Sequence, residues 1–172
     1  MAKKVVPSYQ LLSAEVYALM QKSMPIACVD LIVLRKNLGK LEILLIKRKI
    51  FPEVGKWCII GGRILKNESI EQTIARQAKR ELGVAVQIIR PWSGQEPIGV
   101  FNVPLADAQK HYISLMYPVA IRRGVVNELG PEFSEARWFP INKIPRVMGF
   151  VHRDQVDFAL RRIKGIVIAT KI

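Results

Sequence analysis

Long apolar runs are absent from this sequence, and cysteine is scarce. No stretch reaches the roughly 18 to 20 consecutive apolar residues that a membrane-spanning helix needs, and residues 1–10 lack the apolar segment of a signal peptide. We therefore expect a cytoplasmic protein with no membrane partner. The two cysteines, Cys28 and Cys58, lie in apolar segments without neighbouring histidines, so we expect buried thiols rather than a disulfide or a metal site.

Acidic residues are also in short supply. The chain has 14 Asp and Glu residues against 27 Lys and Arg residues, which gives a formal net charge of +13. Such a charge attracts polyanions in general and does not distinguish nucleotides, nucleic acids and acidic membranes. The basic residues occur in short groups without aromatic residues between them, which favours a solvated basic surface and makes nucleic acid an unlikely partner.

The order of the expected elements indicates one α+β domain over residues 1–172, with residues 1–10 as an N-terminal tail. No linker, internal repeat or low-complexity segment divides the chain. Strands and helices are mixed without regular βαβ alternation. Hydrophobic periodicity predicts helices at about 11–23, 69–82 and 153–163, and strands at about 26–34, 42–49, 57–60, 84–89, 98–103, 112–121 and 136–140.

The helix over 69–82 carries the clearest local signals. Ser69 and Gln72 match a capping box at its start, and Gly83 ends it. Gln77 and Glu81 lie one turn apart on a stripe that flanks the apolar face. This spacing is equally typical of an ordinary amphipathic helix with a surface glutamate.

The Gly61-Gly62 pair precedes this helix and frees the backbone to aim a carbonyl at the space that the stripe faces. A carboxylate and a carbonyl are oxygen ligands of the kind that Mg²⁺ prefers. The segment therefore indicates a magnesium site between the glycine pair and Glu81.

The same segment resembles the Nudix box, a motif of 23 positions. The matching residues stand in register: Gly62, Glu68, Arg76, Glu81, Gly83 and Val84. The resemblance implies a Nudix-type α/β/α sandwich with a mixed β-sheet. Two positions depart from the box, because Gln77 and Arg80 stand where it has glutamates.

With two metal-binding carboxylates missing, the chain looks most like the GDP-mannose mannosyl hydrolase branch of this family. That resemblance implies a homodimer that uses one Mg²⁺, for which Mn²⁺ is a possible substitute. It also implies hydrolysis of a nucleotide sugar, GDP-mannose, by water attack at the anomeric carbon, so that GDP leaves intact.

The resemblance further assigns roles to individual residues. By carry-over, the catalytic and substrate-binding residues are Asp30, Arg48, Arg63 and Tyr112. The metal ligands are the Gly61 carbonyl, Glu81 and Glu132, and the structural ion pair of the box joins Glu68 to Arg76.

The general base is the point at which the resemblance fails, because Phe133 aligns with the histidine of those relatives. The candidates that remain are Glu132, Glu135 and Asp30. If none of them serves as the base, either turnover is slow or the substrate and the chemistry differ. We expect His152 to be a surface or capping residue.

Two rival functions stay open. One is a conventional Nudix pyrophosphatase acting on a nucleotide sugar or a nucleoside triphosphate, with Glu68 and Glu81 sufficing for metal. The other is a nucleotide-binding module that kept the fold and lost catalysis, which the substitutions at Gln77, Arg80 and Phe133 would explain.

Overall fold

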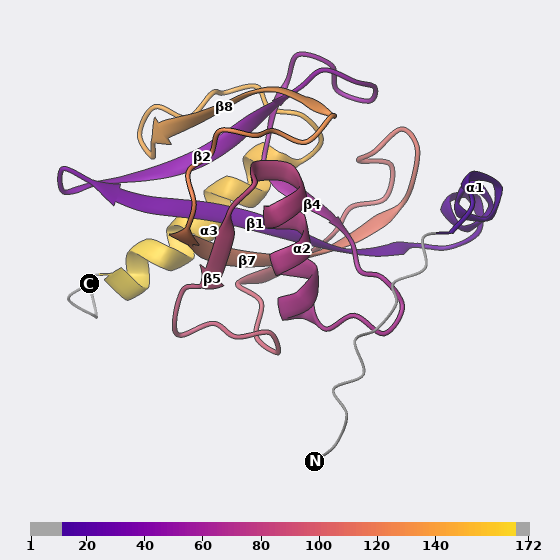
Figure 1. Ribbon diagram of the computed structural model, residues 1–172, viewed down its shortest axis with the longest axis horizontal. Helices are drawn as coiled ribbons and strands as arrows, with labels where there is room; N and C mark the ends of the chain where they lie inside the picture. Colours follow the sequence, from indigo (N-terminus) through magenta and orange to yellow (C-terminus); the bar gives the residue numbers. More distant parts are fainter. Residues whose placement is uncertain (1–11, 168–172) are drawn as a thin grey trace.

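The computed structural model describes residues 12–167, in which one mixed β-sheet is accompanied by three helices (Figure 1). The elements follow in the order α1 (Ala14–Ser23), β1 (Ile26–Asn37), β2 (Lys40–Arg48), β3 (Trp57–Cys58), β4 (Ile60–Arg63), α2 (Ile70–Leu82), β5 (Ala85–Ile88), β6 (Gly99–Asn102), β7 (Tyr112–Arg123), β8 (Phe133–Pro140) and α3 (His152–Val167).

Strand β1 is the centre of the sheet. It forms the expected hairpin with β2, in which Asn37 pairs with Lys40 and both residues between them have positive φ. On its other side β1 runs parallel to β7. On the β2 side, β4 pairs antiparallel with β1 near its start. The order β3-β2-β1-β7-β5 thus mixes parallel and antiparallel neighbours, while β6 pairs with β7 and β8 with β2.

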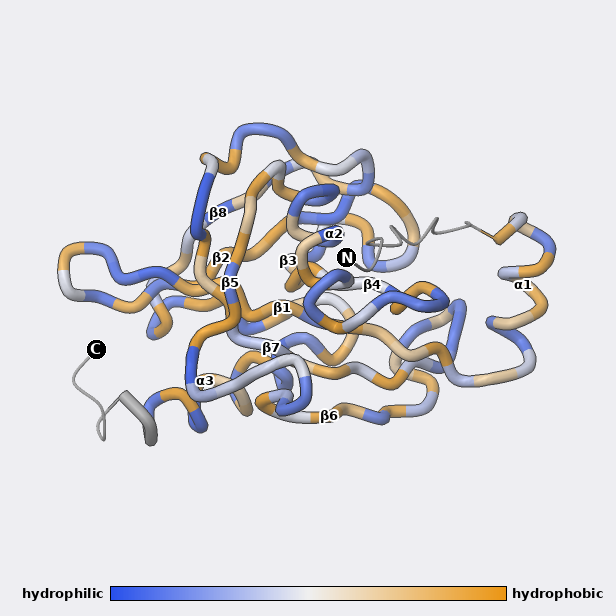
Figure 2. Tube along the Cα trace, turned by 60° about the horizontal axis from the view of Figure 1, so that its bottom comes forward, coloured by the Kyte–Doolittle hydropathy of each residue, from blue (hydrophilic) through white to orange (hydrophobic). Residues whose placement is uncertain are grey.

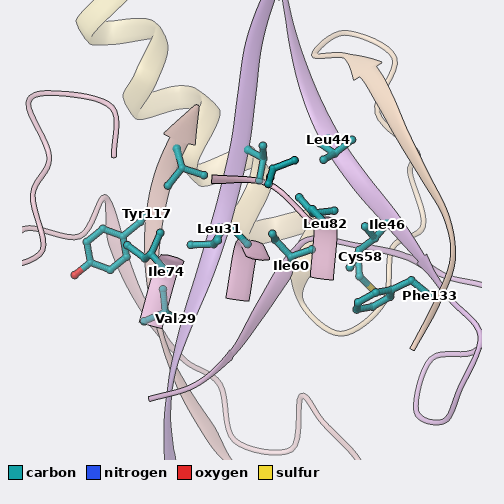
Figure 3. Packing of buried hydrophobic residues seen from close by; sticks show 14 residues of the cluster. Val29, Leu31, Leu44, Ile46, Cys58, Ile60, Ile74, Leu82, Tyr117 and Phe133 are labelled. Atoms are coloured by element: carbon teal, nitrogen blue, oxygen red, sulfur yellow. The ribbon is translucent and has the colours of Figure 1, made fainter. Parts of the chain in front are cut away.

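Both faces of the sheet are covered, which explains the long apolar run of β1. Successive residues of a strand face opposite sides. Val29, Leu31 and Val33 pack into the cluster that includes α2, shown in Figure 3, whereas Ile32 and Leu34 pack into the cluster that includes α3. The orange trace of β1 in Figure 2 reflects the same run. The predicted sandwich of helix, mixed sheet and helix is therefore confirmed.

Helix α2 has the predicted ends. Ser69 and Gln72 form the capping box in both directions, and Gly83 takes the left-handed conformation with φ of 70°. Its buried face includes the polar residues Gln77 and Glu81 as well as apolar ones. Helix α1 differs, because no residue of Ala14–Ser23 is buried, and it lies at the periphery of the sheet in Figure 1.

Two sequence expectations need correction. The predicted strand 57–60 is interrupted at Ile59, whose N–H donates to Nδ1 of His152 at 3.2 Å instead of to a strand. The same contact shows that His152 is not at the surface: it is the first residue of α3 and is buried. Sequence periodicity does not reveal such a contact, because the partners are 93 positions apart.

The two cysteines behave as expected, since Cys28 and Cys58 are both free and buried. None of the helices within 12–167 combines the length and the apolar character needed to cross a bilayer. The predicted tail, residues 1–10, and the predicted start of the first helix at residue 11 lie outside the described residues.

Candidate functional site

A pocket of about 490 Å³ opens where β1, β4, α2 and β7 meet the loops around them. Its lining includes eight of the residues singled out from the sequence, which the fold brings together from distant parts of the chain: Asp30, Arg48, Gly61, Arg63, Arg76, Glu81, Tyr112 and Glu132. Glu68 lies behind the lining, bonded to Arg76.

The two glycines of β4 leave room for polar side chains from neighbouring elements. A Cβ at Gly61 would lie 2.0 Å from Oδ1 of Asp30, and a Cβ at Gly62 would lie 2.0 Å from Nε2 of Gln77. Real Cβ atoms do not approach other heavy atoms so closely. The glycine pair thus lets the backbone of β4 lie directly against the carboxylate of β1 and the amide of α2.

Asp30 is buried in the sheet and held from the α3 side. Its Oδ2 accepts hydrogen bonds from Oγ of Ser114 at 2.5 Å and from Nε2 of Gln155 at 3.0 Å. Burial raises the pKa of Asp30, although both donors favour the ionised form. Since both donors use Oδ2, Oδ1 is the oxygen that lies against Gly61.

Glu68 is fully engaged by its neighbours. Arg76 donates to Oε1 at 2.6 Å and to Oε2 at 2.8 Å, and Oε2 also accepts from Thr73 Oγ1 and from the Leu65 N–H. Burial by itself would raise the pKa of Glu68, but these hydrogen bonds outweigh it and lower the pKa. Arg76 also donates to the Arg63 carbonyl at 2.9 Å, so the pair ties the end of β4 to α2.

Glu81, unlike Glu68, has a carboxyl group that its neighbours engage on one oxygen only. Its side chain is 2% exposed, and Oε1 accepts from Nε of Arg80 at 2.5 Å. Within the described part of the chain, no donor reaches its buried Oε2, which we call the open Glu81 oxygen. Gly130 makes space for this atom, since a Cβ there would lie 2.3 Å from it. Burial raises the pKa of Glu81, and the nearby Glu132 carboxylate raises it further, despite Arg80.

Arg48 and Glu132 line the same pocket and pair with each other. Arg48 Nη1 lies 3.2 Å from Oε2 of Glu132, and its Nε donates to the Pro52 carbonyl at 2.8 Å. These two contacts fix the guanidinium in the pocket. The Arg63 guanidinium is fixed differently, since it lies 3.9 Å from the centre of the Tyr17 ring of α1.

Tyr112 brings a polar atom into an apolar setting. Its hydroxyl is buried, and none of the residues 12–167 offers it a hydrogen-bond partner. Burial raises its pKa, and the Asp30 carboxylate adds to this effect, so the group remains a neutral hydroxyl. An unpaired buried hydroxyl is costly, which is typical of a position that a ligand completes.

The residues present fit one divalent cation. Residues 12–167 hold no cluster of three or more His, Cys, Asp or Glu side chains. The open Glu81 oxygen, however, is a buried carboxyl oxygen that lacks a donor, and Glu132 is close enough to raise the pKa of Glu81. Gly61 lines the same pocket. Few protein oxygens completed by water and phosphate are usual for Mg²⁺.

Of the three candidate general bases, two line the pocket and one does not. Asp30 and Glu132 line the pocket. Glu135 lies on β8, is bonded to Arg137, and is absent from the lining among the residues described. Phe133, which replaces the histidine of the resembling enzymes, also lines the pocket.

His152 is a pocket residue that sequence reasoning missed. Its Nδ1 accepts the Ile59 N–H, so the neutral ring carries its proton on Nε2. Burial, assisted by the charge of Arg48, lowers its pKa to about 3. It is therefore a neutral hydrogen-bond donor at physiological pH. Other lining residues without a sequence signal are Tyr17, Asp107, Gln109 and Lys110.

A family model described as NUDIX domain matches residues 24–158. Among curated proteins, the ADP-ribose pyrophosphatase of Methanocaldococcus jannaschii is 28% identical over 141 residues, which cover 82% of this chain and 76% of that protein. Nucleoside triphosphatase NudI of Escherichia coli (strain K12) is 32% identical over 98 residues. That match covers 53% of this chain and 64% of NudI, less than two thirds of its length.

Solved structures give a similar result. The NUDIX domain of Shewanella oneidensis NrtR, complexed with ADP ribose, superposes with a TM-score of 0.65 at 20% identity and covers 89% of this chain and 99% of that one. A mutT/nudix family protein from Listeria innocua superposes with a TM-score of 0.62 at 26% identity, covering 86% and 99%. None of these four relatives is named a GDP-mannose mannosyl hydrolase.

Proposed function

The chain belongs to the NUDIX domain family, and from this premise we propose that it is a divalent-metal-dependent hydrolase of nucleoside diphosphate sugars. GDP-mannose, the substrate implied by the sequence resemblance, is one member of this class. ADP-ribose, named for the relative from Methanocaldococcus jannaschii, is another. Both carry a diphosphate between a nucleoside and a sugar.

The observation that carries this proposal is Glu81, a pocket-lining carboxyl with no donor on its buried Oε2, together with two fixed arginines. Glu81 Oε2, Glu132 and the Gly61 carbonyl would hold one Mg²⁺ or Mn²⁺, which when bound neutralises charge on the diphosphate. Arg48 and Arg63 are held by protein contacts and can pair with phosphate oxygens without being reordered.

For substrates that carry the diphosphate on the anomeric carbon, as GDP-mannose does, we favour attack of water at that carbon. The C–O bond breaks, its electron pair stays on the departing diphosphate, and the proton of the attacking water passes to a carboxylate. Arg48, Arg63 and the Tyr112 hydroxyl would stabilise the departing diphosphate together with the one divalent ion. The missing glutamates at Gln77 and Arg80 agree with a reaction that needs one ion.

Asp30 is the carboxylate that we propose as proton acceptor. Its Oδ2 is fixed by Ser114 and Gln155, which leaves Oδ1 for the water or for a sugar hydroxyl. Burial raises its pKa, which strengthens the carboxylate as a proton acceptor. Glu132 is less suited to this role, since Arg48 already pairs with it.

A second candidate is a pyrophosphatase that cuts between the two phosphates. The named activity of the archaeal relative, which aligns with 82% of this chain, favours it. The pocket would be the same, and only the position of the attacked atom would differ.

One experiment distinguishes these functions. The protein is incubated with Mg²⁺ and either GDP-mannose or ADP-ribose in oxygen-18-labelled water, and the products are identified by mass spectrometry. Attack at carbon yields GDP and labelled free mannose, and it is open only to GDP-mannose, because ADP-ribose carries its diphosphate on C5 of the ribose and can only be cleaved at phosphorus. Attack at phosphorus yields a nucleoside monophosphate and a sugar phosphate, one of them labelled on phosphate. Absence of all products from both substrates would reject the enzyme and leave a nucleotide-binding module.

A further inference from the structure

The charged residues of the pocket are balanced in sign, which is unexpected for a site that holds a divalent cation. Five cationic residues line it: Arg48, Arg63, Arg76, Arg80 and Lys110. Five acidic residues accompany them, with Glu68 counted because it pairs with Arg76: Asp30, Glu68, Glu81, Asp107 and Glu132. A Nudix box with glutamates at positions 77 and 80 would make the same pocket more negative by three charges.

Arg80 accounts for most of this difference, and it is fixed in place. Its Nε donates to Oε1 of Glu81 at 2.5 Å, and a second contact joins Nη2 to the same oxygen. The side chain is nevertheless 51% exposed and lines the pocket. The guanidinium is therefore anchored on one edge and open to a ligand on the remainder.

Gln77 contributes the rest of the difference. It is buried one turn before Glu81, and its Nε2 lies against Gly62. An amide in this position carries no charge, so an approaching phosphate meets one carboxylate of α2 and not three.

We propose that this pocket binds the diphosphate of its ligand in the absence of a divalent ion, with Arg80 as a phosphate-binding residue. The inference rests on the proposed function only in taking a nucleoside diphosphate as the ligand. Three clustered carboxylates would repel a diphosphate until cations neutralised them, whereas a guanidinium pairs with phosphate in a bidentate manner. The divalent ion is then needed for turnover and not for binding.

Direct binding of ADP and of GDP tests this proposal, measured by isothermal titration calorimetry once in EDTA and once in Mg²⁺. For the wild-type chain we expect binding of at least one nucleotide in EDTA that is within about tenfold of its affinity in Mg²⁺. For Arg80→Glu we expect a loss of roughly 10- to 100-fold in EDTA, because a charge-assisted contact is lost and a like charge is introduced. Added Mg²⁺ should restore much of this loss.

Three further variants define the contact. Arg80→Gln removes the charge without adding a carboxylate and should show an intermediate loss in EDTA. Arg80→Lys keeps the charge and should retain more affinity than Arg80→Gln. Arg122→Glu is the matched control, since Arg122 is exposed, is outside the pocket lining among the described residues, and changes the net charge equally. Thermal unfolding by circular dichroism verifies that each variant is folded.

The proposal is overturned if the wild-type chain binds these nucleotides only with Mg²⁺, or binds neither under any condition. It is also overturned if Arg80→Glu binds in EDTA as tightly as the wild type, or if Arg122→Glu loses as much. Hydrolysis is measured separately. A chain that binds in EDTA but yields no products would reject the proposed reaction and leave this inference standing.

Discussion

Two buried glutamates, one just before helix α2 and one near its end, differ in how completely they are hydrogen-bonded. Glu68, just before the helix, has both oxygens bonded to Arg76, with Thr73 and the Leu65 N–H as further donors. Glu81, near the end, has one oxygen on Arg80, while no residue in 12–167 donates to the other. Both side chains are buried. Two carboxyl groups that are equally buried therefore differ in the hydrogen bonds they receive.

The pKa shifts express this difference. Burial acts to raise the pKa of both groups. At Glu68 the donors more than compensate and lower the pKa, so the ionised form stabilises the fold. At Glu81 they do not, so the ionised form is held at a cost in stability. A carboxyl oxygen that lacks a donor, such as Oε2 of Glu81, is available to a ligand, whereas the oxygens of Glu68, whose bonds are complete, belong to the framework.

The largest expected effect is on turnover, and it should come from removing the charge of Glu81. In Glu81→Gln we expect turnover with Mg²⁺ to fall by about 10² to 10³, because the proposed cation loses an anionic ligand. The melting temperature should stay the same or rise, since a poorly compensated buried charge is removed. Steady-state kinetics and thermal unfolding measure the two quantities. Activity equal to that of the wild type would remove Glu81 from the site.

The same substitution at Glu68 should instead lower stability. In Glu68→Gln we expect the free energy of unfolding to fall by roughly 3 kcal/mol, because Arg76 is left without its anionic partner. This lies at the lower end for a broken buried pair, since Arg76 reaches solvent. Urea denaturation measures the loss. If Glu68→Gln were as stable as the wild type, the framework role of Glu68 would be wrong.

Much of the fold could be predicted because its signals are local. The capping box of Ser69 and Gln72, the αL glycine at Gly83 and the β1–β2 hairpin each depend on a few adjacent residues. The break at Ile59 could not be predicted, because its cause is a hydrogen bond to His152, on a helix far along the chain.

The candidate site divides in the same manner. The box fixed the register of Glu68, Arg76 and Glu81 within one loop and helix. Local sequence could not reveal that Arg48 pairs with Glu132, since 84 positions separate them. Nor could it reveal that Ser114 and Gln155 hold Asp30, because three elements must first pack before these atoms meet.

The smallest of the three expected effects concerns His152 and the dependence of stability on pH. Nδ1 of His152 accepts the Ile59 N–H, and burial lowers the pKa of the ring from 6.5 to about 3. A group whose folded pKa is depressed contributes stability that is present above its unfolded pKa and is lost as pH falls. Between pH 8 and pH 5 the wild type should therefore lose about 2 kcal/mol through this residue.

His152→Asn isolates this contribution, because an amide oxygen can take the place of Nδ1 as acceptor but does not titrate. The variant should be less stable at pH 8, where the missing ring atoms leave a gap, yet its stability should decline less between pH 8 and pH 5. Glu68 does not confuse the comparison, because its lowered pKa places its own loss below pH 4.5. Urea denaturation at each pH gives the two slopes. If stability declined equally with pH in both proteins, His152 would gain its proton in the folded chain. The surroundings of its ring would then be more polar than its burial indicates.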